Sequence, residues 1–209
     1  MKELNFSQTN YPEALKTIDN APQVLYINGE IKPQDKKAVA IVGTRQMSER
    51  GKRLALDFSY NIARSGITIV SGLARGIDTI AHRGALKGGG RTIAVLGSGL
   101  DVIYPPENRS LYTQIMKNGA VVSEYPSKVG PYQVHFLQRN RIITGLSLAV
   151  LVIEGDLRSG TRSTAGWAAD QGKEVFAVPG SPITDFLIEN GAAVGKSPEI
   201  IINYVNSIL

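Results

Sequence analysis

Short apolar segments alternate with helix-like segments along most of this chain, and this alternation restricts the fold more than any other feature. The segment 38–42 contains no polar residue, which is typical of a strand buried on both faces of a parallel sheet. A helix is predicted from about Ser48 to Arg64, where apolar residues recur at four-residue spacing. Further strands are predicted at 67–70, 92–96, 120–122, 148–153 and 174–178, and further helices at 77–86, 108–117, 136–145, 163–171, 186–189 and 199–208. The pattern predicts an α/β fold with a doubly wound, mostly parallel sheet and helices on both faces.

Residues 1–35 have a weaker pattern than the rest of the 209-residue chain. A short helix is predicted near Tyr11 to Leu15, and a short strand at 24–27 leads into a tight turn at Asn28-Gly29. The length fits one domain, or one domain with a small appendage. We therefore expect an N-terminal extension at 1–35 that packs on a core domain at 36–209.

The composition is that of an ordinary globular protein with a moderate excess of positive charge. Hydrophobic residues make up 43% of the chain and charged residues 20%, and the net charge of +5 favours anionic partners. The absence of cysteine excludes disulfides, zinc–thiolate sites and thiol nucleophiles. No apolar segment approaches the roughly 18 residues of a membrane span, and the N-terminus lacks the apolar region of a signal peptide. We therefore expect a cytoplasmic protein that does not enter a membrane.

Glycine- and hydroxyl-rich turns follow the predicted strands, where the carboxyl ends of parallel strands meet at one edge of the sheet. Ligands of such sheets bind at this edge, near the point where the strand order reverses. Glycine lets the backbone approach a phosphate closely, and free amides at the start of a helix attract anions. The turn residues predicted to bind phosphate are Gly43, Thr44, Arg45, Ser71, Gly72, Arg75, Gly97, Ser98, Ser159, Gly160 and Thr161.

Two arginines flank an asparagine shortly before the apolar segment 148–153, at Arg139, Asn140 and Arg141. Guanidinium groups bind phosphates through two parallel hydrogen bonds and stay charged at physiological pH. Placed at the edge of a glycine-rich sheet, these side chains indicate a polyanionic ligand. That ligand is either a nucleotide that is processed or a nucleic-acid strand that is held.

Several of these positions also have an ordinary structural interpretation. The Gly43 turn is equally consistent with a plain strand–helix connection, and Asp78 either caps the following helix or accepts a hydrogen bond from a ribose or a loop amide. His82 lies one helical turn after Asp78, within reach of it, and is interpreted as structural. Tyr104 either stacks on a base or packs under its loop, and Asn108 is expected to cap the helix that begins there.

The sequence offers little for acid–base or nucleophilic catalysis. It contains no Walker A motif, no HExxH motif and no nucleophile elbow. The two histidines, His82 and His135, lie in unrelated contexts, so proton transfer would depend on Glu124, Glu154 or Asp78. We therefore predict a binding protein without catalytic residues, metal or cofactor.

Motifs along nearly the whole chain, over about residues 11–195, resemble those of the DprA/Smf family of DNA-processing proteins. They occur in the order that is typical of the family. The matching segments are AIVGTR (40–45), SGLARGIDTIAH (71–82), TIAVLGSGLDVIYPPEN (92–108), SEYP (123–126), HFLQRNRIITGLS (135–147), SGT (159–161), TA (164–165) and QGKEVFAVPGS (171–181).

The resemblance implies an extended Rossmann-like fold without an established enzymatic activity. It further implies that the chain binds and protects single-stranded DNA, forms a homodimer and helps to load the RecA recombinase during recombination and natural transformation (competence). The family's DNA pocket is positively charged and lies at the sheet edge, so the turns at 43–45 and 71–72 and the segment 139–141 are expected to bind phosphates. Many members also carry a SAM-like or a winged-helix domain, and we expect neither here.

Some positions depart from the family pattern, and two other functions stay open. Pro106 stands where some members have a lysine, and Arg162 replaces an apolar residue after the SGT segment. The first alternative is a LOG-like phosphoribohydrolase that releases the base from a nucleoside monophosphate, although the PGGxGT motif of that branch is absent. The second is a nucleotide-binding sensor domain. Release of free adenine from AMP would identify the hydrolase.

Overall fold

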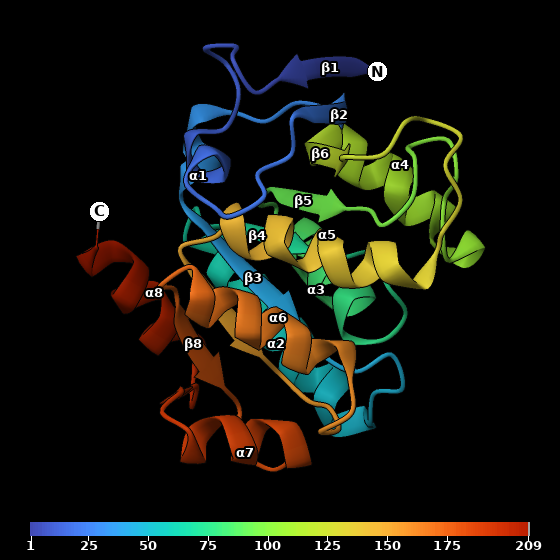
Figure 1. Ribbon diagram of the computed structural model, residues 1–209. Coiled ribbons are helices and arrows are strands. Elements are labelled where there is room, and N and C mark those ends of the chain that lie inside the picture. The colour runs from blue at the N-terminus through green and yellow to red at the C-terminus, as the bar shows by residue number, and fades with distance from the viewer. Residues whose placement is uncertain (209) are drawn as a thin grey trace.

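The computed structural model describes residues 1–208, which form an α/β fold around one nine-stranded sheet (Figure 1). The strands are β1 (Lys2–Asn5), β2 (Val24–Gly29), β3 (Ala38–Val42), β4 (Thr68–Ser71), β5 (Thr92–Val95), β6 (Gly119–Ser123), β7 (Ala149–Val152), β8 (Glu174–Ala177) and β9 (Ala193–Val194). They lie in the order β1-β2-β6-β5-β4-β3-β7-β8-β9. Every neighbouring pair from β6 to β9 in this order is parallel, whereas β1–β2 and β2–β6 are antiparallel. The predicted α/β class and mostly parallel sheet are therefore confirmed.

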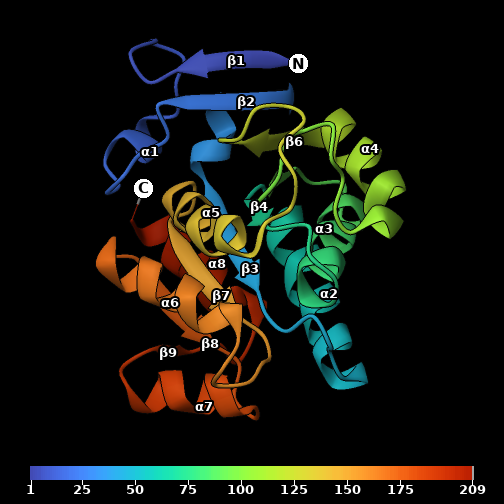
Figure 2. The same ribbon diagram turned by 45° about the vertical axis from the view of Figure 1, so that its right-hand side comes forward.

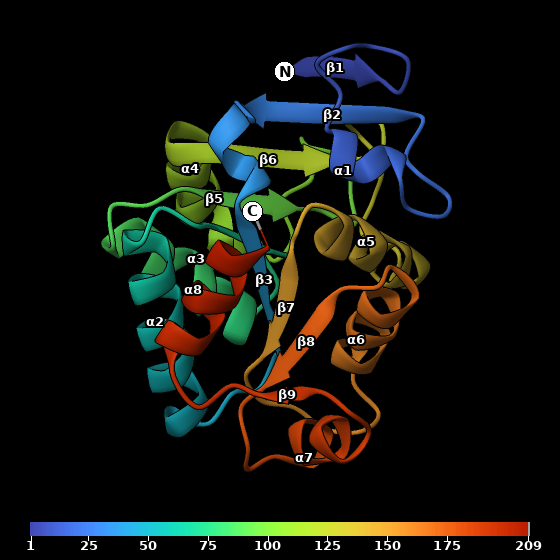
Figure 3. The ribbon, with the colours of Figure 1, turned by 90° about the vertical axis from the view of Figure 1, so that its left-hand side faces the viewer.

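Helices cover both faces of the sheet. They are α1 (Glu13–Lys16), α2 (Glu49–Arg64), α3 (Ile77–Lys87), α4 (Arg109–Asn118), α5 (Gln133–Gly145), α6 (Gly160–Asp170), α7 (Pro182–Glu189) and α8 (Pro198–Ser207), with short 3-10 turns at Pro33–Lys36 and Pro106–Asn108. Helices α2, α3, α4 and α8 lie on one face, and α1, α5 and α6 lie on the other (Figures 2 and 3). None of the helices at 1–208 has both the length and the apolar character that a membrane span requires.

Burial on both faces explains why the central strands are almost purely apolar. All five residues of β3 are buried. Alternate residues of a strand point to opposite faces, so Ala40 and Val42 belong to the core under α5 and α6. Val39 and Ile41 belong to the core under α2, α3 and α8. A polar side chain at any of these positions would lie in an apolar layer.

The direction in which strands are added to the sheet reverses after β6. Strands β3, β4, β5 and β6 follow one another toward one edge, and α5 then brings the chain back to the opposite side of β3, where β7 begins. The switch point therefore lies between β3 and β7. In open α/β sheets the crevice beyond the carboxyl ends of the strands at this point is the usual ligand site.

Most predicted helices and strands are found close to their predicted places, and the differences have local causes. Strand β1 was not predicted, because it is an edge strand with three exposed residues and one half-buried residue. Helices α5 and α6 begin three residues earlier than predicted, at Gln133 and Gly160. Helix α7 begins earlier, at Pro182, because proline is favoured in the first turn of a helix. Residues 2–29 supply two strands of the common sheet, and the division of the chain at 35/36 stays a prediction.

Asp35 fixes the segment that precedes β3. Its carboxylate accepts hydrogen bonds from Arg91 Nε and Nη2 at 2.8 Å, and from Thr68 Oγ1 and the Lys32 amide at 2.7 Å. Burial acts to raise the pKa of Asp35, but these hydrogen bonds outweigh it and hold the pKa below its usual value. An aspartate with a lowered folded-state pKa adds stability above its unfolded pKa of about 3.9, and this stability is lost as the pH falls through the folded pKa.

We expect Asp35→Asn to lower the free energy of unfolding at pH 7 by about 1–3 kcal/mol, because hydrogen bonds to a charged group are lost. The variant should also lose less stability than the unchanged protein when the pH is lowered from 5 to 3. Urea unfolding at pH 7, 5 and 3 measures both effects, with the exposed Asp19→Asn as control. Identical pH profiles for the two variants would contradict this role of Asp35.

Candidate nucleic-acid interface

A cavity of about 670 Å³, which we call the rim cavity, lies at the carboxyl end of β3. Its walls come from the loop after β3, the loop between β4 and α3, helix α5 and the start of α6. The volume is in the range of small-ligand pockets, roughly 300–1,000 Å³. The lining residues are 42–46, Ala74, Asp78, Tyr104, Pro131, Gln133, Phe136, Leu137, Arg139, Asn140, Ile143, 159–161 and Thr164.

Glu154, at the end of β7, fixes the loop that carries Thr44 and Arg45. The Thr44 amide donates to the Glu154 carbonyl at 2.8 Å. The amide and hydroxyl of Ser48 donate to the Glu154 carboxylate at 3.0 to 3.3 Å. Between these anchors the exposed Arg45 extends over the ring of Phe136, with its guanidinium carbon 5.4 Å from the ring centre. No carboxylate among residues 1–208 forms an ion pair with Arg45.

The loop between β4 and α3 is held in a constrained conformation. Leu73 has a φ of +56°, which is unfavourable for a residue with a branched side chain. The Gly72 amide donates to the Asp78 carboxylate at 3.1 Å, so Asp78 binds a loop amide, one of the alternatives predicted for it. Asn108 occupies the N-cap position of α4, but its side chain makes no capping hydrogen bond there. It donates instead to the Leu73 carbonyl at 2.9 Å, because that buried carbonyl needs a donor.

Arg139 is buried below this loop and is only 4% exposed. Its Nη1 donates to the Gly72 carbonyl at 2.7 Å and to the carbonyl of Val95, so one guanidinium connects the ends of β4 and β5. A Cβ atom at Gly72 would lie 2.5 Å from both terminal nitrogens of Arg139, which explains the glycine. Arg139 also donates to Asn140 Oδ1 at 3.3 Å. The guanidinium thus lines the rim cavity and supports its floor at the same time.

Burial sets the charge of the groups below the rim cavity. It raises the pKa of Asp78 and lowers the pKa of Arg139 to about 10, while their mutual attraction opposes both shifts. Arg139 therefore stays charged at pH 7. Burial, helped by Arg139, lowers the pKa of His82 to about 3, so this histidine is neutral. His82 is structural, as predicted, but its Nδ1 lies 2.7 Å from Thr92 Oγ1 and not beside Asp78.

The start of α6 forms another wall of the rim cavity. Ser159, Gly160 and Thr161 face the rim cavity, and the free amides of the first helical turn lie here. The Ser159 hydroxyl is buried and has no hydrogen-bond partner within residues 1–208. Such a wall suits an anion. Among residues 1–208, no group of three His, Asp or Glu side chains could hold a metal ion.

Four of the predicted phosphate binders lie behind the rim cavity and do not line it. The Ser71 hydroxyl donates to the Ile41 carbonyl and the Ser98 hydroxyl to the Val102 carbonyl, both at 2.7 Å. A Cβ atom at Gly97 would lie 2.7 Å from the ring of Phe136, so Gly97 makes room for that ring. The fourth residue is Arg141, whose guanidinium is paired with Glu124. Roles for these four residues in phosphate binding stay predictions.

The remaining predicted residues are brought together at the rim cavity or at its mouth. They are Gly43, Thr44, Arg45, Arg139, Asn140, Ser159, Gly160 and Thr161 in the rim cavity, and Gly72 and Arg75 in a small adjoining pocket. Phe136 was not predicted, although its spacing from Asn140 and Ile143 on α5 indicates a common face. Tyr104 is 37% exposed, and its ring centre lies 5.7 Å from that of Phe136, so both face the opening.

Comparison with known proteins relates the chain to two solved structures. It is 38% identical to DNA processing protein A (DprA) from *Streptococcus pneumoniae*, with a TM-score of 0.91 over 97% of this chain and 73% of that one. It is 34% identical to DNA processing protein A from *Helicobacter pylori*, with a TM-score of 0.86 over 96% of this chain and 94% of that one. The structural work on the *Helicobacter* protein concerns its single-stranded DNA binding mode.

Sequence relatives and a family model point to the same family as the solved structures. Protein Smf of *Synechocystis* sp. is 46% identical over 195 residues, which are 88% of this chain and 49% of the relative. The chain thus spans about half the length of this relative. The model of the family described as DNA recombination-mediator protein A matches residues 2–206. The chain therefore belongs to the DNA recombination-mediator protein A family, which is the DprA/Smf family.

Proposed function

We propose that this chain binds single-stranded DNA at the rim cavity and acts as a recombination mediator that helps to load RecA. The observation that carries the proposal is the position of Arg45, which has no ion-pair partner among residues 1–208 and lies at the mouth of a cavity lined by Arg139, Phe136 and the start of α6. The *Helicobacter* relative, which is associated with single-stranded DNA, supports it. A homodimer and a cytoplasmic location are parts of the same proposal.

The dimensions of the rim cavity favour a single strand over a duplex. A cavity of about 670 Å³ can receive a base or a phosphate of one nucleotide, but not a paired double helix. Only an unpaired base is free to enter and to meet the ring of Phe136. Phosphates on either side of that nucleotide would remain near Arg45. Neutralisation of these phosphates would supply much of the affinity, with little dependence on sequence.

Binding should weaken steeply with salt. For about three phosphate contacts, the log of the affinity should fall with a slope of about −2 against the log of the salt concentration. Arg45→Ala should weaken binding about tenfold or more and reduce the slope by about 0.7. Fluorescence anisotropy with a labelled oligothymidylate measures both quantities. The exposed Lys117→Ala, on α4 away from the rim cavity, is the matched control. Binding that does not change between 50 and 300 mM salt would contradict the proposal.

Glu107 competes with phosphate for Arg75. Arg75 Nε lies 2.5 Å from Glu107 Oε1, and Nη2 lies 3.2 Å from Oε2. Arg75 also lies over the ring of Tyr104, with its guanidinium carbon 6.0 Å from the ring centre. Glu107→Gln should therefore tighten binding of single-stranded DNA roughly 2- to 5-fold, because an exposed ion pair is weak and its loss frees a cation. The gain should disappear in the double variant Arg75→Ala/Glu107→Gln. A tighter complex in both variants would show that Arg75 makes no phosphate contact.

Two further assays separate this function from the alternatives. Incubation with AMP should yield no free adenine, and its appearance would favour the phosphoribohydrolase. Loading is tested by RecA filament formation on single-stranded DNA that is already coated with a single-strand binding protein. The chain should shorten the delay before filaments form, and Arg45→Ala should not. An equal delay with and without the chain would restrict the proposal to DNA binding.

A further inference from the structure

Three aromatic side chains lie in contact beside the rim cavity, two of them stacked and the third edge-on. The rings of Tyr125 and His135 are stacked, with centres 3.9 Å apart and planes 17° apart. Tyr132 meets His135 edge-on at 5.2 Å between centres. Tyr125 also hydrogen-bonds through its hydroxyl to Gln138 on α5, at 3.2 Å. The stack therefore fixes the loop after β6 to the first turns of α5.

The outer end of this group is Tyr132. Two further exposed apolar side chains, Val134 and Leu137, follow it in the first turns of α5, and we call these three residues the α5 platform. These side chains are 60%, 53% and 45% exposed. Of the eight large apolar side chains that are exposed within residues 1–208, three therefore lie within six consecutive residues. Single exposed apolar residues are common, but a group of them next to a binding cavity marks an interaction surface.

The α5 platform continues the wall of the rim cavity. Leu137 lines the cavity itself, and so do Pro131 and Gln133 on either side of Tyr132. Phe136 points into the cavity and its neighbour His135 into the stack, so the first turns of α5 carry aromatic rings on both sides. Tyr132 and Phe136 are four residues apart, which corresponds to about 6 Å along a helix. Bases stacked along one strand are about 3.4 Å apart, so one strand can reach both rings.

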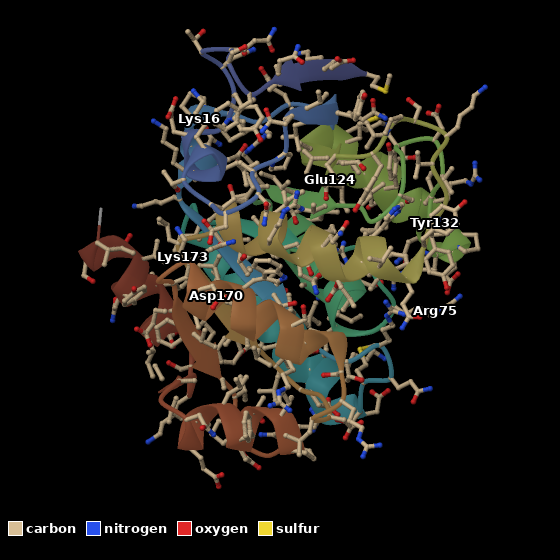
Figure 4. The ribbon with its side chains drawn as sticks, in the orientation of Figure 1. Lys16, Arg75, Glu124, Tyr132, Asp170 and Lys173 are labelled. Atoms are coloured by element: carbon tan, nitrogen blue, oxygen red, sulfur yellow. The ribbon has the colours of Figure 1, made fainter. Side chains whose placement is uncertain are left out.

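On the basis of the proposed function, we infer that the α5 platform binds the base next to the nucleotide in the rim cavity, with Tyr132 as its stacking surface. An aromatic ring held against His135 is preorganised for stacking, so little side-chain entropy is lost on binding. Arg45, whose guanidinium lies over the ring of Phe136, attracts the phosphates that link the two nucleotides. Figure 4 labels Tyr132 beside the start of α5. A duplex cannot offer the face of a base to this surface, so the α5 platform also favours single strands.

The test compares Tyr132→Ala with Tyr132→Phe, using a labelled twelve-residue oligothymidylate and an abasic oligonucleotide with the same phosphates. Because Tyr132 is 60% exposed, both variants should fold, which thermal unfolding verifies. Tyr132→Ala should bind the oligothymidylate about 5- to 100-fold more weakly. Tyr132→Phe should bind like the unchanged protein. Affinity for the abasic strand and the salt slope should be the same in all three proteins, because no cation is removed.

The possible results separate the two proposals. If the unchanged protein binds neither oligonucleotide, the proposed function fails and the inference fails with it. If it binds both, and Tyr132→Ala binds the oligothymidylate equally well, only the stacking surface is overturned. An equal loss for the abasic strand would also overturn stacking. If Tyr132→Ala instead changes the mass in sedimentation equilibrium and leaves DNA affinity intact, the α5 platform is a contact between copies of the chain.

Discussion

Arg139→Ala is expected to lower the free energy of unfolding at pH 7 by about 3–5 kcal/mol and to abolish measurable binding of single-stranded DNA. The guanidinium is buried and donates to the Gly72 carbonyl and to the carbonyl of Val95. Its removal leaves both carbonyls without this donor and leaves the buried Asp78 without its nearest cation. The loops that shape the rim cavity would lose a common support. Urea unfolding and DNA anisotropy on the same samples measure the two effects.

The pH dependence of the stability of Arg139→Ala shows whether the loss comes from the unpaired charge of Asp78 or from the lost hydrogen bonds. Burial already raises the pKa of Asp78, and loss of Arg139 should raise it further. An acid with a raised folded-state pKa stabilises the protein at low pH, and this contribution is lost as the pH rises through that pKa. The destabilisation should therefore be larger at pH 8 than at pH 5. The double variant Arg139→Ala/Asp78→Asn should recover part of the loss at pH 8, because no carboxylate is then buried without a cation. A destabilisation that is equal at both pH values would mean that only the hydrogen bonds matter.

Arg141→Ala is expected to destabilise the protein by a similar amount, about 3–5 kcal/mol, but to leave DNA affinity within about twofold. Arg141 donates to both carboxylate oxygens of Glu124, at 2.7 and 2.6 Å, with side chains that are 9% and 16% exposed. Its Nε donates to the Asn20 carbonyl at 2.9 Å. These bonds hold the N-terminal segment, α5 and the end of β6 together. Figure 4 labels Glu124 at the end of β6, on the side of the sheet covered by α5.

The matched variant for this prediction is Glu124→Gln, which keeps the size of the side chain and removes its charge. If the pair is structural, a double-mutant cycle with Arg141→Ala should give a coupling free energy above about 1 kcal/mol. Both single variants should then bind oligothymidylate like the unchanged protein at temperatures where they are folded. A loss of affinity in Arg141→Ala as large as that in Arg45→Ala would place Arg141 in the DNA site.

The layered fold could be predicted because its signals are local. Strand β3 is apolar throughout because both of its faces are covered, and α2 shows the spacing of a helix with one buried face. The edge strand β1 carries no such signal, because only one of its four residues is even half-buried. The starts of α5 and α6 were also missed. The N-cap residue of α5 is Tyr132, which is not a typical capping residue, and Ser159 at the N-cap of α6 makes no side-chain capping hydrogen bond.

The rim cavity could be predicted only in part, because turn motifs give the edge of the sheet but not the direction of each side chain. Arg45 and Arg139 were both expected at the edge, and both line the rim cavity. Arg141 follows two residues after Arg139, about 200° around the helix, so it points toward Glu124 on the other side of α5. The hydroxyl groups of Ser71 and Ser98 fit a phosphate loop equally well in sequence, yet they satisfy nearby carbonyls. The partner of Ser71 lies on β3 and that of Ser98 four residues along the same loop, and neither is evident from a turn motif.

The most direct measurement is a map of backbone amide chemical shifts during titration with a twelve-residue oligothymidylate. The amides of residues 43–46, 72–75 and 159–161 should shift together and saturate at one affinity, because they surround one rim cavity. Amides of α8 and of the exposed face of α4 should not move. Saturable binding with shifts confined to those helices, and none at 43–46 or 159–161, would contradict a DNA site at this edge of the sheet.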